Sequence, residues 1–126
     1  MSNLKVNIAG VEFKNPIITA SGTFGFGKEY GEFYPLSALG GICTKGLTLK
    51  KREGNPPPRV AETYGGMLNS VGLQNPGIEH YLAEDDKRLA KEDVVVIANI
   101  AGSTLEDYIA IGERINDSHA DMVELN

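Results

Sequence analysis

The sequence is poor in the side chains that most often bind metals or form cross-links: its 126 residues include one cysteine, two histidines and no tryptophan. A single cysteine, Cys43, excludes an intrachain disulfide and fits a reducing cytoplasm. We expect Cys43 to be a small core residue, because no histidine lies near it in the sequence to activate it. His80 and His119 fall in predicted helix or loop surroundings, so we expect both on the surface and predict no metal site.

Long apolar runs and an excess of basic residues are also missing. No stretch approaches the roughly 18 apolar residues of a membrane-spanning helix, and the first residues lack the apolar run of a signal peptide. We therefore predict a cytoplasmic protein without membrane contact. The net charge of -5 argues against a nucleic-acid partner, since nucleic acids favour a basic surface. The short basic cluster Lys50, Lys51, Arg52 and Arg59 is interpreted as a solvated loop.

Glycine, by contrast, is abundant, with 15 residues gathered at the ends of apolar runs. Such placement indicates backbone that approaches a ligand closely. The loop S-G-T-F-G-F-G after residue 20 lacks the G-x-G-x-x-G spacing of dinucleotide-binding loops, so a Rossmann fold is not predicted. Length and a hydrophobic share of 41% fit a single domain over residues 1–126.

Apolar periodicity predicts strands and helices in alternation, after an N-terminal hairpin around Ala9 and Gly10. The predicted strands are 6–8, 11–13, 17–20, 40–44, 94–100 and 122–125. The first predicted helix, 29–39, is interrupted by Pro35. The second has Asn75 as its N-cap and Pro76 as its first residue, and apolar residues at helical spacing from Ile78 carry it to about Lys91. Between strand 40–44 and Asn69 we expect a long loop, of the kind that forms lids or small excursions.

A third helix follows the capping box S-T-L-E at 103–106. Its predicted apolar face consists of Leu105, Tyr108, Ile109, Gly112 and Ile115. Alternating strands and helices indicate parallel strands with right-handed crossovers. A (β/α)8 TIM barrel needs eight strands and about 250 residues. We therefore predict an α/β fold: the N-terminal half of such a barrel, with about four βα units after the hairpin. A half-barrel that pairs with itself is the alternative.

One segment, 69–77, is unusually rich in amides and glycine: N-S-V-G-L-Q-N-P-G. An asparagine side chain offers an acceptor and two donors in one plane. Together with exposed backbone N–H groups, such a loop suits a flat ligand with alternating N–H and C=O groups, and pyrimidine-like rings are of that kind. A polar turn before a helix is the plainer interpretation of Asn-Pro-Gly alone.

The predicted strand ends carry small, hydroxyl, amide or cationic side chains, and in parallel α/β proteins ligands bind at this end of the sheet. Lys45 is the one positive charge among them. It could pair with a phosphate, form a Schiff base or stabilise an anion on a cofactor ring, and a structural salt bridge is the alternative. Asn99 and Asn126 end buried strands and need partners for their amides, which a ligand could supply. Glu124 shares a strand face with Asn126 and is a candidate paired carboxylate that orients its neighbours.

The motifs together resemble dihydroorotate dehydrogenase across the whole chain. They are T-A-S-G-T-F-G-F-G, C-T-K-G-L-T, R-E-G-N-P-P-P-R, N-S-V-G-L-Q-N-P-G, A-N-I-A-G-S and V-E-L-N. The sequence is most similar to the class 1 catalytic subunit, in the NAD-linked B-type branch. The resemblance implies an oxidoreductase and flavoprotein of pyrimidine (UMP) biosynthesis that uses FMN to oxidise dihydroorotate to orotate. It also implies an iron–sulfur FAD subunit that passes electrons to NAD, and a homodimer partner.

The resemblance implies two sets of site residues. Residues expected at the cofactor are Ala20, Ser21, Gly22, Lys45, Gly46, Asn99 and Asn126. Residues expected at the substrate are Lys45, Asn69, Ser70, Val71, Gly72, Leu73 and Asn126. In the family one ring carbon loses a proton to a base while its neighbour gives hydride to the flavin.

The sequence departs from the family pattern in one respect. The family's strand continues as N-I-S-C-P-N, whose cysteine is the catalytic base, and this sequence stops at Asn126. No catalytic residue is therefore expected within it, and we expect it to be inactive or very weak alone. Two alternatives stay open: a non-catalytic truncated half-barrel, and another FMN barrel, such as a dihydropyrimidine dehydrogenase domain or a dihydrouridine synthase. The acidic charge argues against the RNA-directed synthase.

Overall fold

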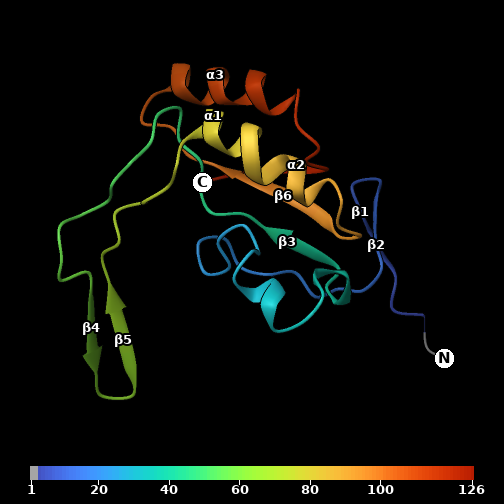
Figure 1. Cartoon of the computed structure of the whole chain (residues 1–126), viewed down its shortest axis with the longest axis horizontal. Helices are drawn as coiled ribbons and strands as arrows, with labels where there is room; N and C mark the ends of the chain where they lie inside the picture. Colours follow the sequence, from blue (N-terminus) through green and yellow to red (C-terminus); the bar gives the residue numbers. More distant parts are fainter. Residues whose placement is uncertain (1–2) are drawn as a thin grey trace.

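A three-stranded parallel sheet is the centre of the fold. The computed structural model describes residues 3–126, and its sheet has the order β3 (Gly41–Cys43), β6 (Val95–Ile100), β7 (Met122–Leu125). Ile42 of β3 pairs with Val96 of β6, and Asn99 of β6 pairs with Glu124 of β7. Parallel strands were predicted from the alternation of strands and helices, and this prediction is confirmed. The three helical segments α1, α2 and α3 lie on the same side of β6 (Figure 1).

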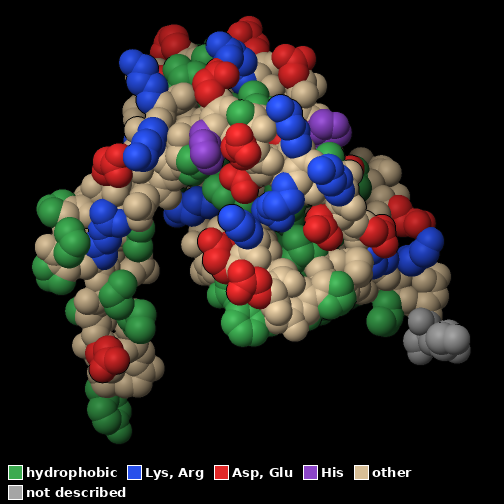
Figure 2. Space-filling model, viewed as in Figure 1, with side chains coloured by type: hydrophobic (Ala, Val, Ile, Leu, Met, Phe, Trp, Pro, Cys, Tyr) green, Lys and Arg blue, Asp and Glu red, His purple; other side chains and the backbone are tan. Residues whose placement is uncertain are grey.

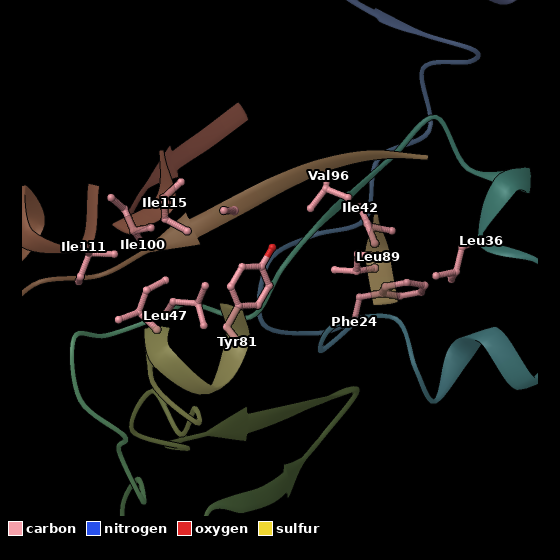
Figure 3. Close-up of a cluster of buried hydrophobic side chains, with 12 residues drawn as sticks. Phe24, Leu36, Ile42, Leu47, Tyr81, Leu89, Val96, Ile100, Ile111 and Ile115 are labelled. Atoms are coloured by element: carbon pink, nitrogen blue, oxygen red, sulfur yellow. The ribbon is translucent and has the colours of Figure 1, made fainter. Parts of the chain in front are cut away.

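The apolar core lies between this sheet and the helices (Figure 3). Alternate residues of the strands, among them Ile42 and Ile100, point into it and meet Tyr81 and Ile111 from the helices. Tyr81 is fully buried, and its hydroxyl has no hydrogen-bond partner within residues 3–126. Burial therefore raises the pKa of Tyr81 above its ordinary value, and the nearby Asp86 carboxylate raises it further.

The N-terminal segment forms the predicted hairpin of β1 (Val6–Ile8) and β2 (Val11–Phe13), paired antiparallel. The expected strand 17–20 is wrong in extent, because it is reduced to a single parallel bridge between Ile18 and Gly41. The N–H groups of Gly40 and Gly41 both donate to the Ile17 carbonyl. This segment therefore continues the sheet beyond β3 by one bridge only.

The expected helix 29–39 is replaced by two short 3-10 helices, η1 (Tyr30–Glu32) and η2 (Leu36–Ala38). Pro35 separates them: its ψ of 134° is extended, and it has no N–H to continue a helix. The proline that was expected to interrupt one helix therefore ends it.

The second predicted helix is present as α1 (Ile78–His80), a π-helical stretch η3 (Tyr81–Asp85) and α2 (Asp86–Leu89). Its first residue is Ile78 and its N-cap is Gly77, so the predicted N-cap at Asn75 is wrong by two residues. The Asn75 carboxamide oxygen accepts a hydrogen bond from the Gly77 N–H at 2.9 Å. Asn75 therefore forms a turn before the helix, and the φ of 86° at Gly77 redirects the chain into it.

The third helix, α3 (Leu105–Ile115), begins one residue later than the predicted box implies. Thr104 is the N-cap and its hydroxyl accepts from the Asp107 N–H, while the Asp107 carboxylate accepts from the Ser103 N–H. Asp107 thus takes the place expected for Glu106. The predicted apolar face is partly wrong: Ile115 is buried as expected, but Leu105 and Ile109 are exposed, and the buried Ile111 was not predicted.

A β-hairpin projects from the body where sequence analysis expected only a loop (Figure 1). It consists of β4 (Val60–Thr63) and β5 (Gly66–Asn69), and we call these residues and their turn the arm. Every residue of both strands is exposed, and apolar side chains show along the projection (Figure 2). Its two-residue turn is Tyr64 and Gly65, and the φ of 72° at Gly65 fits the preference of such turns for glycine. Within residues 3–126 no helix is long and apolar enough to span a bilayer.

Candidate functional site

The polar face of the sheet is the face opposite the helices. Because side chains alternate along a strand and Ile42, Val96 and Ala98 point to the helices, Cys43, Asn99 and Glu124 must point the other way. Asn99 lies opposite Glu124 in the register. Polar and ionisable side chains of three neighbouring strands therefore share one surface near the carboxyl ends of the strands.

Asn99 is the centre of this surface and is only 1% exposed. Its side-chain amide nitrogen donates to the Glu124 carboxylate, and its carboxamide oxygen accepts from the Asn126 amide at 3.2 Å. Its backbone N–H donates to the Thr44 hydroxyl at 3.1 Å. The amide is therefore satisfied within the protein, whereas sequence analysis considered a ligand as its partner.

The hydrogen bond from Asn99 lowers the pKa of Glu124 below its usual value of 4.5, because it stabilises the ionised carboxylate. The neighbouring Cys43 is buried, as predicted. Burial first, and the Glu124 charge second, raise the pKa of the Cys43 thiol to about 12. The thiol is therefore neutral at physiological pH and is not an activated nucleophile.

Gly46 is the point where the strand ends meet the amide-rich segment. A side-chain carbon added there would lie 2.7 Å from the Asn99 carboxamide oxygen and 3.0 Å from a methyl carbon of Leu73. The Asn126 amide nitrogen would be 3.5 Å away. A glycine is required because only a hydrogen atom fits at this distance.

The amide-rich segment is attached to the body through Asn75, which is 4% exposed. Its carboxamide oxygen accepts from the Thr48 N–H at 3.1 Å, and its amide nitrogen donates to the Thr48 hydroxyl and the Leu73 carbonyl, both at 2.9 Å. Backbone hydrogen bonds with Arg52, in both directions, form an antiparallel bridge. The loop just before Asn75 is thereby fixed against the body, with Leu73 in the left-handed region at a φ of 55°.

Two further side chains hold the base of the arm. Arg59 donates to the Gln74 side-chain oxygen at 2.7 Å and to the Glu53 carbonyl at 2.8 Å. Asn55 donates to the Ser70 carbonyl and hydroxyl at 3.0 and 2.9 Å. The amide segment is consequently linked to the loop that precedes the arm as well as to the body.

A pocket of about 600 Å³ opens between the strand ends and the amide segment. This volume lies in the range of small-molecule sites. The residues that line it are Ser21, Gly22, Thr23, Lys45, Asn69, Val71, Gly72, Leu73 and Gln74. The lining contains one cation and no carboxylate, so its charge favours an anionic or electron-rich ligand.

Lys45 has no ion-pair partner within residues 3–126, so the salt bridge weighed for it is not observed. Its backbone N–H donates to the Gly25 carbonyl at 2.9 Å, which fixes its position at the pocket. A carbon added at Gly22 would lie 3.4 Å from the Lys45 ammonium nitrogen. The glycine leaves that ammonium group accessible from the side of the loop.

The structure brings together most, but not all, of the residues expected at a site. Seven of them line the pocket, and Asn99 and Asn126 lie beside Gly46 at its edge. Ser70 is hydrogen-bonded to Asn55 instead, and Ala20 is an exposed loop residue. Thr23 and Gln74 also line the pocket but were not predicted, although both belong to the quoted motifs. The histidines lie elsewhere: His80 and His119 are exposed, and His119 contacts the buried Asp86 at 2.7 Å.

The fold and the site define a class: an α/β protein with its polar pocket at the carboxyl ends of parallel strands, as in barrel enzymes. The family model described as dihydroorotate dehydrogenase matches residues 3–126. The chain therefore belongs to the dihydroorotate dehydrogenase family.

Curated relatives agree with this assignment. A catalytic subunit of dihydroorotate dehydrogenase B (NAD(+)) from Petrotoga mobilis is 56% identical over 126 residues, covering 100% of this chain and 42% of the relative. The corresponding subunit from Alkaliphilus metalliredigens is 54% identical over 124 residues, 98% of this chain and 41% of the relative. The predicted resemblance to the NAD-linked catalytic subunit is confirmed. The chain spans about two fifths of the length of these relatives.

A solved structure supports the fold. The crystal structure of dihydroorotate dehydrogenase (DHODH) in complex with ferulenol from Eimeria tenella matches with a TM-score of 0.76 and 22% identity, over 98% of this chain and 36% of that chain. At this identity the likeness concerns the fold alone. The α/β class is confirmed, and the number of βα units and the half-barrel stay predictions.

Proposed function

We propose that the chain provides part of the site of a flavin-dependent enzyme that oxidises dihydroorotate to orotate in pyrimidine biosynthesis. The observation that carries this proposal is the pocket, because its lining combines residues of the amide-rich segment 69–77 with Lys45, a cation that has no ion-pair partner among residues 3–126. A cation suits both the carboxylate of dihydroorotate and an electron-rich ring. The amides and backbone N–H groups suit the imide edge of the pyrimidine. Family membership and the curated relatives support the same activity.

The residues present fit a flavin mononucleotide. Gly22 keeps the space beside the Lys45 ammonium group free of a side chain, and Gly46 lets Asn99, Asn126 and Leu73 approach the strand end closely. FMN would supply the acceptor for a hydride. The proposed FMN residues are Ala20, Ser21, Gly22, Lys45, Gly46, Asn99 and Asn126. The proposed dihydroorotate residues are Lys45, Asn69, Ser70, Val71, Gly72, Leu73 and Asn126.

In this reaction one ring carbon loses a proton and its neighbour loses a hydride, and a double bond forms between them. Lys45 would stabilise the negative charge that develops on the acceptor. Asn69 and the backbone near Gly72 would hold the substrate ring in one orientation. No Asp, Glu, His or Cys side chain lines the described pocket, so it lacks the carboxylate, imidazole or thiolate that most often takes such a proton. We therefore propose that residues 3–126 alone are inactive or nearly so.

The proposed setting is a cytoplasmic complex in which electrons pass to an iron–sulfur FAD subunit and on to NAD, with a homodimer of the catalytic subunit. The names of the relatives, NAD(+)-linked catalytic subunits, support a partner subunit and NAD.

A flavin titration tests the proposal directly. FMN fluorescence quenching is measured on the purified chain, on Lys45→Met, and on the control Lys91→Met, an exposed lysine that does not line the pocket. We expect saturable FMN binding that Lys45→Met weakens about tenfold, about 1.4 kcal/mol, and that Lys91→Met leaves unchanged. Saturable binding with equal affinity in all three proteins would contradict the role of Lys45. If the folded chain does not bind FMN, the proposal is contradicted, and the alternative of a non-catalytic half-barrel is favoured.

A further inference from the structure

The Glu124 carboxylate determines which way the Asn99 amide faces. An ionised carboxylate only accepts hydrogen bonds, and a glutamate carboxylate is ionised at neutral pH. Asn99 must therefore turn its amide nitrogen toward Glu124, as observed. Its carboxamide oxygen then faces Gly46 and Asn126.

This orientation is passed on to Asn126. The Asn99 oxygen can only accept, so Asn126 turns its amide nitrogen toward it, at 3.2 Å. The carboxamide oxygen of Asn126 is left as an acceptor for other partners. The backbone of Asn126 is fixed independently, because its N–H donates to the Ile100 carbonyl and its own carbonyl accepts from the Tyr108 hydroxyl. Glu124 therefore affects only the orientation of the Asn126 side-chain amide.

We propose that Glu124 is a positioning residue: through Asn99 it fixes the Asn126 side chain so that its oxygen is presented to a ring N–H of FMN. The inference rests on the proposed function, because FMN is the cofactor proposed there. Glu124 itself does not line the pocket and acts through the two asparagines.

The contacts of Glu124 distinguish this role from simple support of the sheet. Its hydrogen bond is to the side chain of Asn99, whereas the β6–β7 pairing runs through the backbone. Glu124 is exposed, yet Asn99 is buried. A carboxylate that receives the amide of a buried asparagine orders a polar group, and an apolar residue there would leave the Asn99 amide with one partner fewer.

The test uses the side-chain amide signals of Asn99 and Asn126 in nitrogen-15 NMR spectra of the chain. The variants are Glu124→Leu, which removes the acceptor, and Glu124→Gln, which retains an acceptor oxygen of the same shape. Glu62→Gln on the arm is the control, an exposed carboxylate without an ion pair among the described residues. We expect Glu124→Leu to shift both asparagine signals, Glu124→Gln to shift them less, and the control to leave them in place.

Unchanged signals of Asn126 in Glu124→Leu would overturn the proposal, because the orientation would then not depend on Glu124. If Glu124→Leu does not fold, the asparagine signals of Glu124→Gln decide the test. Both oxygens of the Glu124 carboxylate accept hydrogen bonds, whereas a glutamine amide can rotate and turn its NH2 group toward Asn99. FMN titration is the second readout: we expect about tenfold weaker binding for Glu124→Leu and less than threefold for Glu124→Gln. Failure of the unmodified chain to bind FMN would contradict the proposed function, while the NMR comparison would still decide the role of Glu124.

Discussion

The two sides of the pocket are built in different ways. On the strand side, β3 and β6 are largely buried and the polar residues are joined in a hydrogen-bonded row from Thr44 through Asn99 to Asn126. On the arm side, every residue of β4 and β5 is exposed. The strand side is held by an apolar core beneath it, whereas the arm is held by hydrogen bonds at its base. Buried contacts stabilise the first region, and local pairing stabilises the second.

The two regions differ in how strongly a substitution should change the stability of the fold. The strand ends cannot change without disturbing the core under them, because strand pairing and side-chain packing are coupled there. The arm can change its exposed residues with little cost. The amide segment belongs to both regions, since Asn75 joins it to the body and Asn55 joins it to the base of the arm.

The largest effect is expected from a truncation in the core of the strand side. Ile42→Ala should lower the free energy of unfolding by about 3 to 4 kcal/mol, because it leaves a cavity among buried neighbours; Ile42 is 1% exposed. The matched control on the arm, Leu68→Ala, should cost under about 0.5 kcal/mol, since Leu68 is 65% exposed. Urea denaturation measures both. Equal losses would show that the arm is packed in solution and would remove the contrast.

Asn75→Ala tests the connection between the two sides. It leaves the backbone N–H groups of Thr48 and Gly77 without an acceptor in a buried position, and we expect a loss of about 2 to 3 kcal/mol. Asn55→Ala, on exposed atoms at the arm base, should cost less than half as much. The measurement is urea denaturation followed by circular dichroism. A larger loss for Asn55→Ala would place the main anchor of the segment in the arm.

Gly46→Ala tests the close approach between strand ends and amide segment. The added carbon would meet Asn99 at 2.7 Å, so we expect a loss of about 1 to 2 kcal/mol through overpacking. The control is Gly112→Ala in α3, where no atom lies within 4 Å of the added carbon. That change should stabilise the helix by about 0.5 to 1 kcal/mol. Thermal unfolding of the two variants should therefore shift in opposite directions, and a shift in the same direction would contradict the packing at Gly46.

The smallest effect concerns pH. Because the folded-state pKa of Glu124 is lowered from 4.5, its contribution to stability is present above that value and is lost as pH falls through the folded pKa. Glu124 is exposed, so solvent screening limits the contribution to a few tenths of a kcal/mol. The difference between the unmodified chain and Glu124→Gln should be present at about pH 7 and vanish at about pH 3. A difference that grows in acid would reverse the assigned sign.

The same Glu124 charge acts on Cys43 and raises its thiol pKa, in addition to burial. Glu124→Gln should therefore lower the pKa of Cys43 while leaving it well above neutral, because desolvation is the larger cause. The pH dependence of thiol alkylation measures this shift. No change would show that the carboxylate and the thiol are not coupled.

The sequence by itself determined the family, the parallel strands and most of the pocket lining. Val94–Ile100 is apolar except for Asn99, because its strand is buried on the helix side and at least half-buried on the other. The motif at 69–77 was recognisable because amides and glycines are concentrated in it, and Lys45 because it is the one cation among the predicted strand ends. Local chemistry fixed the N-terminal hairpin at Ala9 and Gly10 as well.

Only the tertiary structure decided the rest. The arm escaped prediction because its strands are exposed on both sides and carry no alternation to reveal them. Helix starts moved because side chains competed for the same N–H groups: Asn75 took the Gly77 N–H, and Asp107 rather than Glu106 reached back to Ser103. The partners of Asn99 were likewise undecided until three strands came together, since hydrogen bonds between distant residues depend on the register of the sheet and not on neighbouring residues.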